Sequence, residues 1–319
     1  MNNRILILIL LLFLNKSTMS NDFSSPFHPF KSQKAKEKYL AFNQKESLKW
    51  PVPCDTQYVS TSYGKTFVRI SGPLDAPPMV LIPGGAVSSL IWIPNIKDFS
   101  KGFRVYAIDN IYDFGKSVNS RKMTESSDFV GWLDELFDTL SLRKDISLIG
   151  LSNGGAIVAQ YALHKPSRLK RTVLMAPAFT ILPIKFEFWF RVSLCFLPGE
   201  YFKKSFGNWI FADLAKLPGT SNKQDNPDET AVAMVCFKIK NPVFPKVLTD
   251  NELGRIKVPI LFMIGENEKI YSVEKAIKRI KRTAPSFQVS IIKNAGHDLT
   301  IVQSDSVDKM VVAFLMDKE

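Results

Sequence analysis

The chain has 319 residues, of which 45% are hydrophobic and 23% are charged. This composition is typical of a globular protein, and it excludes a disordered chain and a polytopic membrane protein. The formal net charge is +12 at pH 7, but no nucleic-acid-binding motif accompanies it. We therefore interpret the basic residues as a solvated surface, with weak attraction to an anionic membrane surface as the second interpretation and no nucleic-acid partner.

The N-terminal segment carries the first local signal. Residues 5–14, "ILILILLLFL", form an uninterrupted apolar run. A helix of about ten residues covers about 15 Å, roughly half of the hydrocarbon core of a bilayer, so this run is short for a membrane span. We expect residues 1–20 to be a signal peptide, with an uncleaved N-terminal anchor as the alternative. The protein would then be exported (periplasmic or secreted) or held at the membrane by this segment.

Residues 21–50 are polar and lysine-rich and show no clear periodicity. This pattern predicts a tether or an irregular wrap. From residue 51 onward, strand and helix patterns alternate. Residues 57–61 and 66–71 alternate on either side of Tyr63-Gly64, which predicts a β-hairpin.

Short apolar runs with helical segments between them follow the hairpin. Such a succession predicts an α/β fold with a mostly parallel sheet that is covered on both faces. The strand candidates are "PMVLIPGG", "FRVYAIDN", "ISLIGLS", "RTVLMAPA", "VPILFMIGE" and "FQVSIIKN", and the helix candidates include "SDFVGWLDELFDTLSL", "GGAIVAQYALHKPSRL" and a final helix from about Ser306 to Met316.

The alternation breaks once, over residues 179–257. This stretch holds a dense group of aromatic residues and then the polar run "GTSNKQDNPDET". We interpret it as an insertion between two strands of a core that comprises residues 51–178 and 258–319.

Ser152 stands between two glycines in "ISLIGLSNGGAIVAQYA". A strand that leads through G-x-S-x-G into a helix predicts a nucleophile elbow, a tight turn in which Gly150 and Gly154 avoid steric clashes. The alternative is an ordinary glycine-rich turn of a nucleotide-binding unit. That alternative is disfavoured because neither G-x-G-x-x-G nor G-x-x-x-x-G-K-[ST] occurs in the chain.

A serine hydroxyl needs a general base, and the chain has three histidines. His28 lies in the polar N-terminal stretch, and His164 lies near the end of the helix that follows the elbow. His297 lies in "NAGHDLT", directly after a predicted strand. The carboxyl ends of parallel strands meet at one edge of the sheet, so His297 is predicted to lie at the same edge as Ser152.

The base in turn needs a carboxylate that orients the imidazole and stabilises the imidazolium. The strand "VPILFMIGE" ends in "GENEKIY", which offers Glu266 and Glu268. We prefer Glu268, and Glu266 is the rival. The resulting chain order of serine, acid and histidine is the one expected for a nucleophile elbow of this kind.

A tetrahedral intermediate needs two preorganised N–H donors for its oxyanion. The residue after the nucleophile, Asn153, would supply one. The second is expected from the glycines that follow "PMVLIP", and we predict Gly85, with Ala86 as the neighbouring alternative. Cys54, Cys195 and Cys236 lack metal-ligand spacing, so no metal site is predicted. We expect the three thiols to be unpaired, with a Cys195–Cys236 pair as the alternative.

These motifs together resemble the α/β-hydrolase family. "PGGAVSSLIW", "AIDNIYDFGKS", "GLSNGG", "GENE" and "NAGHDL" occur in the family's order within residues 55–318. The resemblance implies a doubly wound, mostly parallel sheet with a helical cap, residues 179–257, inserted after the sixth strand. It implies Ser152 as nucleophile, His297 as base and Glu268 as acid, with no metal or organic cofactor.

The sequence departs from the family pattern at two points. Pro83-Gly84 stands where the loop of the oxyanion hole commonly begins with His-Gly, so a side chain that often braces this loop is missing. Glu268 stands where this group usually has aspartate, and the additional methylene requires a small shift of the loop.

The residues predict a serine hydrolase that cleaves small-molecule carboxylic esters through an acyl-enzyme. The aromatic insertion suggests an apolar acyl or alcohol group. Thioesterase, amidase or carbon–carbon hydrolase activity on the same triad remains an alternative. An inactive ligand-binding relative is the alternative from another functional class. Such a protein would be expected to have lost the serine, the histidine or the acid of the triad.

Overall fold

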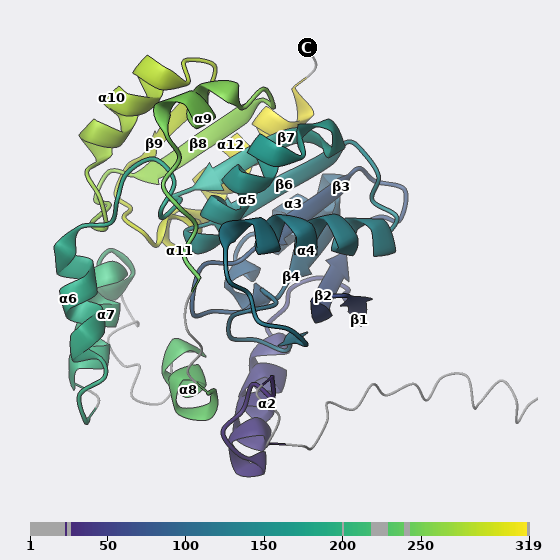
Figure 1. Cartoon of the computed structure of the whole chain (residues 1–319), viewed down its shortest axis with the longest axis vertical. Helices are drawn as coiled ribbons and strands as arrows, with labels where there is room; N and C mark the ends of the chain where they lie inside the picture. The colour runs from purple at the N-terminus through teal and green to yellow at the C-terminus, as the bar shows by residue number, and fades with distance from the viewer. Residues whose placement is uncertain (1–22, 24–26, 200, 218–228, 239–242, 318–319) are drawn as a thin grey trace, which may run out of the picture.

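The computed structural model describes residue 23 and residues 27–199, 201–217, 229–238 and 243–317 (Figure 1). The predictions for residues 1–20 fall outside this part of the chain. Within it, no helix combines the length and the apolar character needed to cross a bilayer.

A single sheet organises the core. Its strands lie in the order β1-β2-β4-β3-β6-β7-β8-β9, and the short β5 pairs with β2. Pairing is antiparallel along β1, β2 and β4, and it is parallel from β4 to β9. The strands are β1 (Asp55–Thr61), β2 (Gly64–Ser71), β3 (Pro78–Ile82), β4 (Arg104–Ile108), β5 (Val118–Asn119), β6 (Ile146–Leu151), β7 (Leu169–Met175), β8 (Ile260–Gly265) and β9 (Gln288–Ile292).

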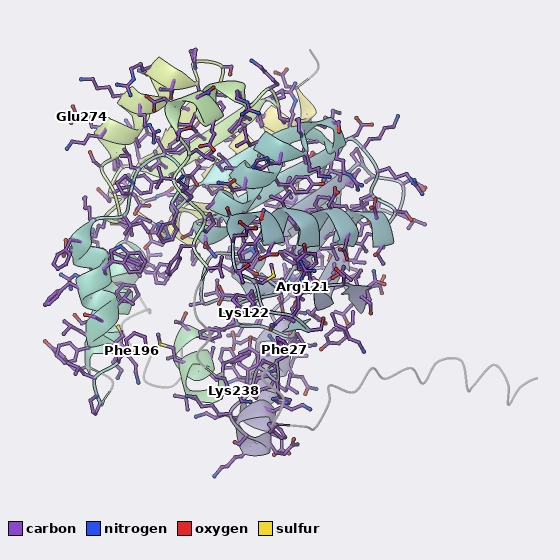
Figure 2. The ribbon with its side chains drawn as sticks, viewed as in Figure 1. Phe27, Arg121, Lys122, Phe196, Lys238 and Glu274 are labelled. Atoms are coloured by element: carbon purple, nitrogen blue, oxygen red, sulfur yellow. The ribbon has the colours of Figure 1, made fainter. Side chains whose placement is uncertain are left out.

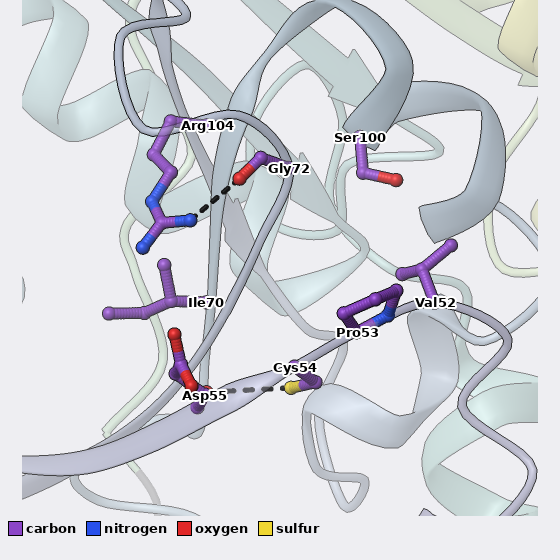
Figure 3. A pocket seen from close by; sticks show the side chains of 8 residues that line it. All are labelled: Val52, Pro53, Cys54, Asp55, Ile70, Gly72, Ser100 and Arg104. Atoms are coloured by element: carbon purple, nitrogen blue, oxygen red, sulfur yellow. Dashed lines mark hydrogen bonds between the residues drawn. The ribbon is translucent and has the colours of Figure 1, made fainter.

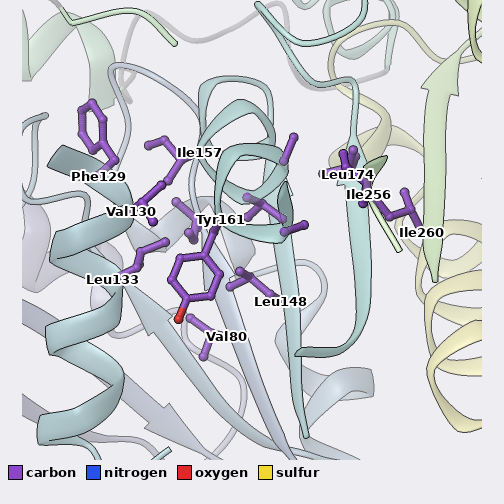
Figure 4. Packing of buried hydrophobic residues seen from close by; sticks show 14 of the residues in the cluster. Val80, Phe129, Val130, Leu133, Leu148, Ile157, Tyr161, Leu174, Ile256 and Ile260 are labelled. Atoms are coloured by element: carbon purple, nitrogen blue, oxygen red, sulfur yellow. The ribbon is translucent and has the colours of Figure 1, made fainter. Parts of the chain in front are cut away.

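Helices cover both faces of the sheet, as the continuous apolar strands predict. All residues of β6 and β8 are buried. On one face, the side chains of α4 (Ser126–Thr139), α5 (Asn153–His164) and α10 (Val273–Thr283) pack onto the strands, and Figure 4 shows Leu133 and Tyr161 beside Val80 and Leu148. On the other face lie α3 (Ile96–Gly102) and α12 (Ser304–Met316). The predicted mostly parallel α/β sheet is confirmed.

Residues 33–47 form a helix within the segment that was expected to be a tether or an irregular wrap. This helix is α2 (Gln33–Ser47). Ser32 is the N-cap of this helix, and its hydroxyl oxygen accepts a hydrogen bond from the Ala35 N–H. Tyr39 is fully buried and packs against Phe30 and Phe237. Only two residues of α2 are buried, so its apolar stripe is too narrow to produce a clear helical period in the sequence.

The insertion between β7 and β8 is helical where the structure describes it. It contains α6 (Phe186–Leu194), α7 (Tyr201–Ile210), the 3₁₀ turn η3 (Leu214–Lys216) and α8 (Glu229–Cys236). In Figure 1 these helices stand apart from the sheet, and α8 packs beside α2. A further helix, α9 (Asp250–Arg255), lies within the predicted insertion but packs against α5 and α10, so it belongs structurally with the core.

Candidate active site

The elbow at Ser152 is a strained turn between β6 and α5. Ser152 has φ 52° and ψ −117°, a left-handed conformation that is costly for a residue with a Cβ. Two backbone hydrogen bonds hold it: the Ser152 N–H donates to Met175 O at 2.9 Å, and the Ala178 N–H donates to Ser152 O at 3.1 Å. A Cβ on Gly150 would lie 2.3 Å from Gly154 O, so the turn requires glycine at that position.

Three side chains form one chain of hydrogen bonds. The Ser152 Oγ–His297 Nε2 distance is 2.8 Å, and the His297 Nδ1–Glu268 Oε2 distance is also 2.8 Å. Ser152 follows β6, Glu268 follows β8 and His297 follows β9, so all three lie where parallel strands end. Both side chains of the His297–Glu268 pair are buried: 6% of the His297 side chain and none of the Glu268 side chain is exposed. The geometry therefore brings together the three residues that the sequence predicts as a triad.

Glu268 is held as a carboxylate although it is buried. Its Oε1 accepts hydrogen bonds from the N–H groups of Lys269 and Ile270, at 2.8 and 3.0 Å. Burial raises the pKa of Glu268, but the charge and hydrogen bond of His297 and these two N–H donors outweigh burial and leave the pKa below its ordinary value.

The same interaction shifts the pKa of His297 in the opposite direction, upward. Burial lowers the pKa of His297, but the charge of Glu268 and the hydrogen bond to it raise the pKa above its ordinary value of 6.5. The pair thus favours an imidazolium next to a carboxylate.

The remaining candidates lie elsewhere. Glu266 is exposed, and its Oε1 accepts a hydrogen bond from the Asn294 N–H at 2.5 Å. His164 is exposed at the end of α5, and the ring of His28 packs against Phe23. Glu268, and neither Glu266 nor another histidine, completes the hydrogen-bonded chain.

The loop after β3 lies against the elbow. A Cβ on Gly84 would lie 3.5 Å from Ser152 Cβ, and one on Gly85 would lie 3.7 Å from Asn153 Cβ. The Ala86 N–H already donates to both carboxylate oxygens of Asp113 at 3.2 Å. This interaction leaves Gly85 as the better candidate of the two for a donor to an oxyanion, together with the Asn153 N–H at the start of α5.

The insertion contacts the loops that carry the acid and the base. The Leu214 N–H donates to Asp298 Oδ2 at 2.7 Å, next to His297 in sequence. Asn267 Nδ2 donates to Asp213 Oδ2 at 3.0 Å, next to Glu268 in sequence. No sequence pattern predicts either contact, because each one joins two residues that lie more than 50 positions apart.

A separate cavity of about 290 Å³ opens where β1 and β4 begin (Figure 3). Arg104 lies at its rim and donates through Nη1 to Gly72 O at 2.6 Å. Because β4 begins at Arg104, the cavity is at the edge of the sheet opposite to Ser152. We therefore assign the candidate active site from the hydrogen-bonded chain and not from this cavity. The residues that line this separate cavity are Val52, Pro53, Cys54, Asp55, Ile70, Gly72, Ser100 and Arg104.

All three cysteines, Cys54, Cys195 and Cys236, are free thiols, as the sequence predicts. Among the residues that the structure describes, no group of three or more His, Cys, Asp or Glu side chains is arranged to hold a metal ion.

The chain is similar to known proteins in sequence and in fold. Residues 77–206 match the family model for the alpha/beta hydrolase fold. The chain is 37% identical over 302 residues to the uncharacterized carboxylesterase nap of Bacillus subtilis, a match that covers 93% of this chain and 97% of that protein. It is also 37% identical over 282 residues to the carboxylesterase YbfK of the same organism, covering 87% and 93% of the two chains. The crystal structure of naproxen esterase from Bacillus subtilis superimposes with a TM-score of 0.81 at 35% identity, covering 88% of this chain and 98% of that one.

Replacing Glu268 by Gln is expected to lower the pKa of His297, because the neutral amide no longer stabilises the imidazolium. Replacing the exposed Glu266 by Gln serves as the matched control and should leave that pKa unchanged. The measurement is an NMR titration of the three histidine rings. A His297 pKa that responds to Glu266→Gln and not to Glu268→Gln would contradict the assignment.

Proposed function

This chain belongs to the α/β-hydrolase family, and we propose that it is a serine carboxylesterase that acts through an acyl-enzyme. The observation that carries the proposal is the hydrogen-bonded chain from Ser152 through His297 to Glu268. The named activities of the relatives support the reaction class, since both curated relatives are carboxylesterases by name and the solved relative is named naproxen esterase.

In this mechanism, His297 Nε2 takes the proton of the Ser152 hydroxyl while Oγ attacks the ester carbonyl carbon. The backbone N–H groups of Gly85 and Asn153 donate to the oxyanion that forms. His297 then passes its proton to the leaving alcohol, and the acyl group stays on Ser152. Water then attacks the acyl carbon while His297 takes its proton. His297 returns this proton to Ser152 Oγ as the bond to the acyl group breaks, and the carboxylic acid leaves.

The charge interaction between His297 and Glu268 suits this acylation and deacylation cycle. The step that forms the oxyanion also forms an imidazolium, and Glu268 stabilises that cation from a buried position. The base must be neutral before the reaction begins. Because the pKa of His297 is raised, the acidic limb of the rate profile should lie above pH 6.5 in the free enzyme.

We infer a substrate with an apolar acyl or alcohol group from the aromatic residues near the elbow. Phe179 follows Ala178, whose N–H is bonded to Ser152 O. The ring centroid of Phe179 lies 5.9 Å from that of Trp189 and 4.7 Å from that of Phe244. These rings come from the insertion, which supports its proposed role as the cap over the site. Aromatic surfaces of this kind bind apolar groups and exclude water.

Thioesters, amides and activated carbon–carbon bonds are the alternative substrates for the same three side chains. The proposed ester specificity is supported by the relatives' names and not by a contact in the site. An inactive ligand-binding protein is disfavoured, because the hydroxyl, the imidazole and the carboxylate are all present and within hydrogen-bonding distance of one another.

We further propose that the protein is exported, or held at the membrane by residues 1–20, and that it associates weakly with anionic lipid surfaces. The apolar run at residues 5–14 and the net charge of +12 support this proposal. The segment of α6 and α7 also supports it, because Phe186, Phe196 and Tyr201 are 80%, 66% and 77% exposed. The exposed Lys204 follows Tyr201 by three positions in α7. Figure 2 shows Phe196 at the far end of this helical pair. Exposed aromatic and basic residues together are typical of surfaces that bind lipid interfaces.

Replacing Ser152 by Ala or His297 by Ala is expected to reduce hydrolysis of short-chain p-nitrophenyl esters by about 10⁴-fold or more, because nucleophile and base act as a unit. Glu268→Gln should cost about 10⁴-fold through loss of imidazolium stabilisation and tautomer control. The matched control Glu266→Gln should stay within about threefold of the wild type, as is usual for surface substitutions. The measurement is kcat/KM on an acyl chain-length panel, with parallel thioester and anilide substrates.

Three results would contradict parts of the proposal. Retention of ester hydrolysis by Ser152→Ala would remove the proposed nucleophile. A larger loss in Glu266→Gln than in Glu268→Gln would move the acid to Glu266. Faster turnover of the thioester or the anilide than of the matched ester would favour the alternative substrates.

Vesicles of phosphatidylcholine and phosphatidylglycerol should slow hydrogen exchange in the α6–α7 segment of the full chain, and less so at high salt because of screening. The variant with Phe186→Ser, Phe196→Ser and Tyr201→Ser should lose this protection. Leu74→Ser is the matched control, since Leu74 is 78% exposed on the turn between β2 and β3. Protection that survives the triple substitution would rule out these residues as the lipid contact.

A further inference from the structure

The loop that follows β3 is held by carboxylates. We define the oxyanion loop as residues 83–89, which contain Gly85. Three of its backbone N–H groups donate to acidic side chains: Ala86 to Asp113 at 3.2 Å, Ser88 to Glu229 Oε2 at 3.1 Å and Ser89 to Asp109 Oδ1 at 2.8 Å. Such charge-assisted hydrogen bonds are roughly twice as strong as neutral ones. They brace a loop that lacks the His-Gly start common in this family.

Glu229 differs from the other two carboxylates in where it comes from. Asp109 and Asp113 follow β4, the strand that pairs with β3. Glu229 is the first residue of α8, in the insertion, and lies 141 positions from Ser88. The next residue, Thr230, donates through Oγ1 to Ala86 O at 3.2 Å. The start of α8 therefore contacts both a donor and an acceptor of the oxyanion loop.

Glu229 also contacts the N-terminal helix. Its Oε1 accepts a hydrogen bond from the Tyr39 hydroxyl at 2.8 Å. Tyr39 is fully buried and anchors α2 against α8 through Phe237. One carboxyl group thus joins the insertion, the N-terminal helix and the oxyanion loop.

We propose that Glu229 is a positioning residue that holds the oxyanion loop in its reactive conformation by accepting the Ser88 N–H. Without this acceptor, Ser88 would keep an unpaired N–H next to the segment that carries Gly85. A shift of about 1 Å at a site that stabilises charge can cost about 10²-fold in rate. This inference rests on the proposed function, because the loop matters to catalysis only if an oxyanion forms beside Ser152.

The role requires an acceptor oxygen and not a negative charge. Burial raises the pKa of Glu229 to about 7, against the hydrogen bonds from Ser88 and Tyr39, which lower it. Both protonation states are therefore populated near neutral pH. In the protonated state the carbonyl oxygen still accepts from Ser88, and the O–H can donate to Tyr39. A glutamine offers the same two functions, one through its oxygen and one through its amide N–H.

The test compares Glu229→Gln with Glu229→Met, two side chains of similar volume of which glutamine alone keeps a strong acceptor. The Met variant should lose about 10- to 100-fold in kcat on a short-chain p-nitrophenyl ester with KM changed less than about threefold, the pattern of an interaction made in the transition state. Its affinity for a trifluoromethyl ketone, which forms an oxyanion on Ser152, should fall in parallel. The Gln variant should stay within about threefold of the wild type in all three quantities.

Tyr39→Phe is the control for the other half of the contact. It removes the hydroxyl that donates to Glu229 but leaves the Ser88 interaction, so kcat should stay within about threefold of the wild type. If Glu229→Met does not fold, Glu229→Ala replaces it in the comparison with Gln.

Equal kcat values for the Gln and Met variants would overturn the proposal, and so would a loss in Tyr39→Phe as large as that in Glu229→Met. A wild type without ester hydrolysis that depends on Ser152 would instead overturn the proposed function. The two failures are therefore distinguishable.

Discussion

The carboxyl ends of β6, β8 and β9 lie along one edge of the sheet, and the hydrogen bonds from Ser152 through His297 to Glu268 join the loops that leave those ends. Burying the carboxylate of Glu268 would cost several kcal/mol if it were left unpaired. Two backbone N–H donors and the imidazole meet its oxygens, so the charge is retained in the protein interior. The strained elbow is likewise held by backbone hydrogen bonds to Met175 and Ala178. The parallel sheet therefore sets both the position and the protonation of the candidate site.

The insertion is tied to the same edge of the sheet. Asp213 and Leu214 contact the acid and base loops, and Glu229 and Thr230 contact the oxyanion loop. The insertion thus contacts residues beside the triad and residues of the oxyanion loop. The N-terminal helix joins this arrangement through Tyr39. A few polar contacts between segments far apart in sequence therefore join the N-terminal helix, the insertion and the loops of the candidate site.

Much of the core could be predicted because its signals are local. The apolar runs of the parallel strands, the glycines around Ser152 and the position of His297 after a strand are all readable within a few residues. The choice between Glu266 and Glu268 was harder, because the two stand two positions apart in a loop without periodicity. In the folded protein, Glu268 is buried and accepts hydrogen bonds from the N–H groups of Lys269 and Ile270. Glu266 is exposed.

Other features have no local signal. Helix α2 buries only Tyr39 and Asn43, so its lysine-rich sequence resembles a solvated tether. The carboxylates that accept hydrogen bonds from the oxyanion loop were also missed, although Asp109 and Asp113 lie in the family-like stretch "AIDNIYDFGKS". Their partners are backbone N–H groups, which every residue except proline carries, so no sequence pattern marks the contact. Glu229 reaches the loop from the insertion, and only the tertiary fold brings it there.

In the proposed mechanism, His297 makes the hydroxyl of Ser152 nucleophilic. The most direct measurement is intact-mass analysis and peptide mapping after treatment of the folded full chain with an organophosphonate ester. We expect one adduct per chain, located on Ser152, and a strongly reduced labelling rate in His297→Ala. Folded protein that stays unlabelled, or that carries its adduct on another residue, would show that Ser152 is not the activated nucleophile.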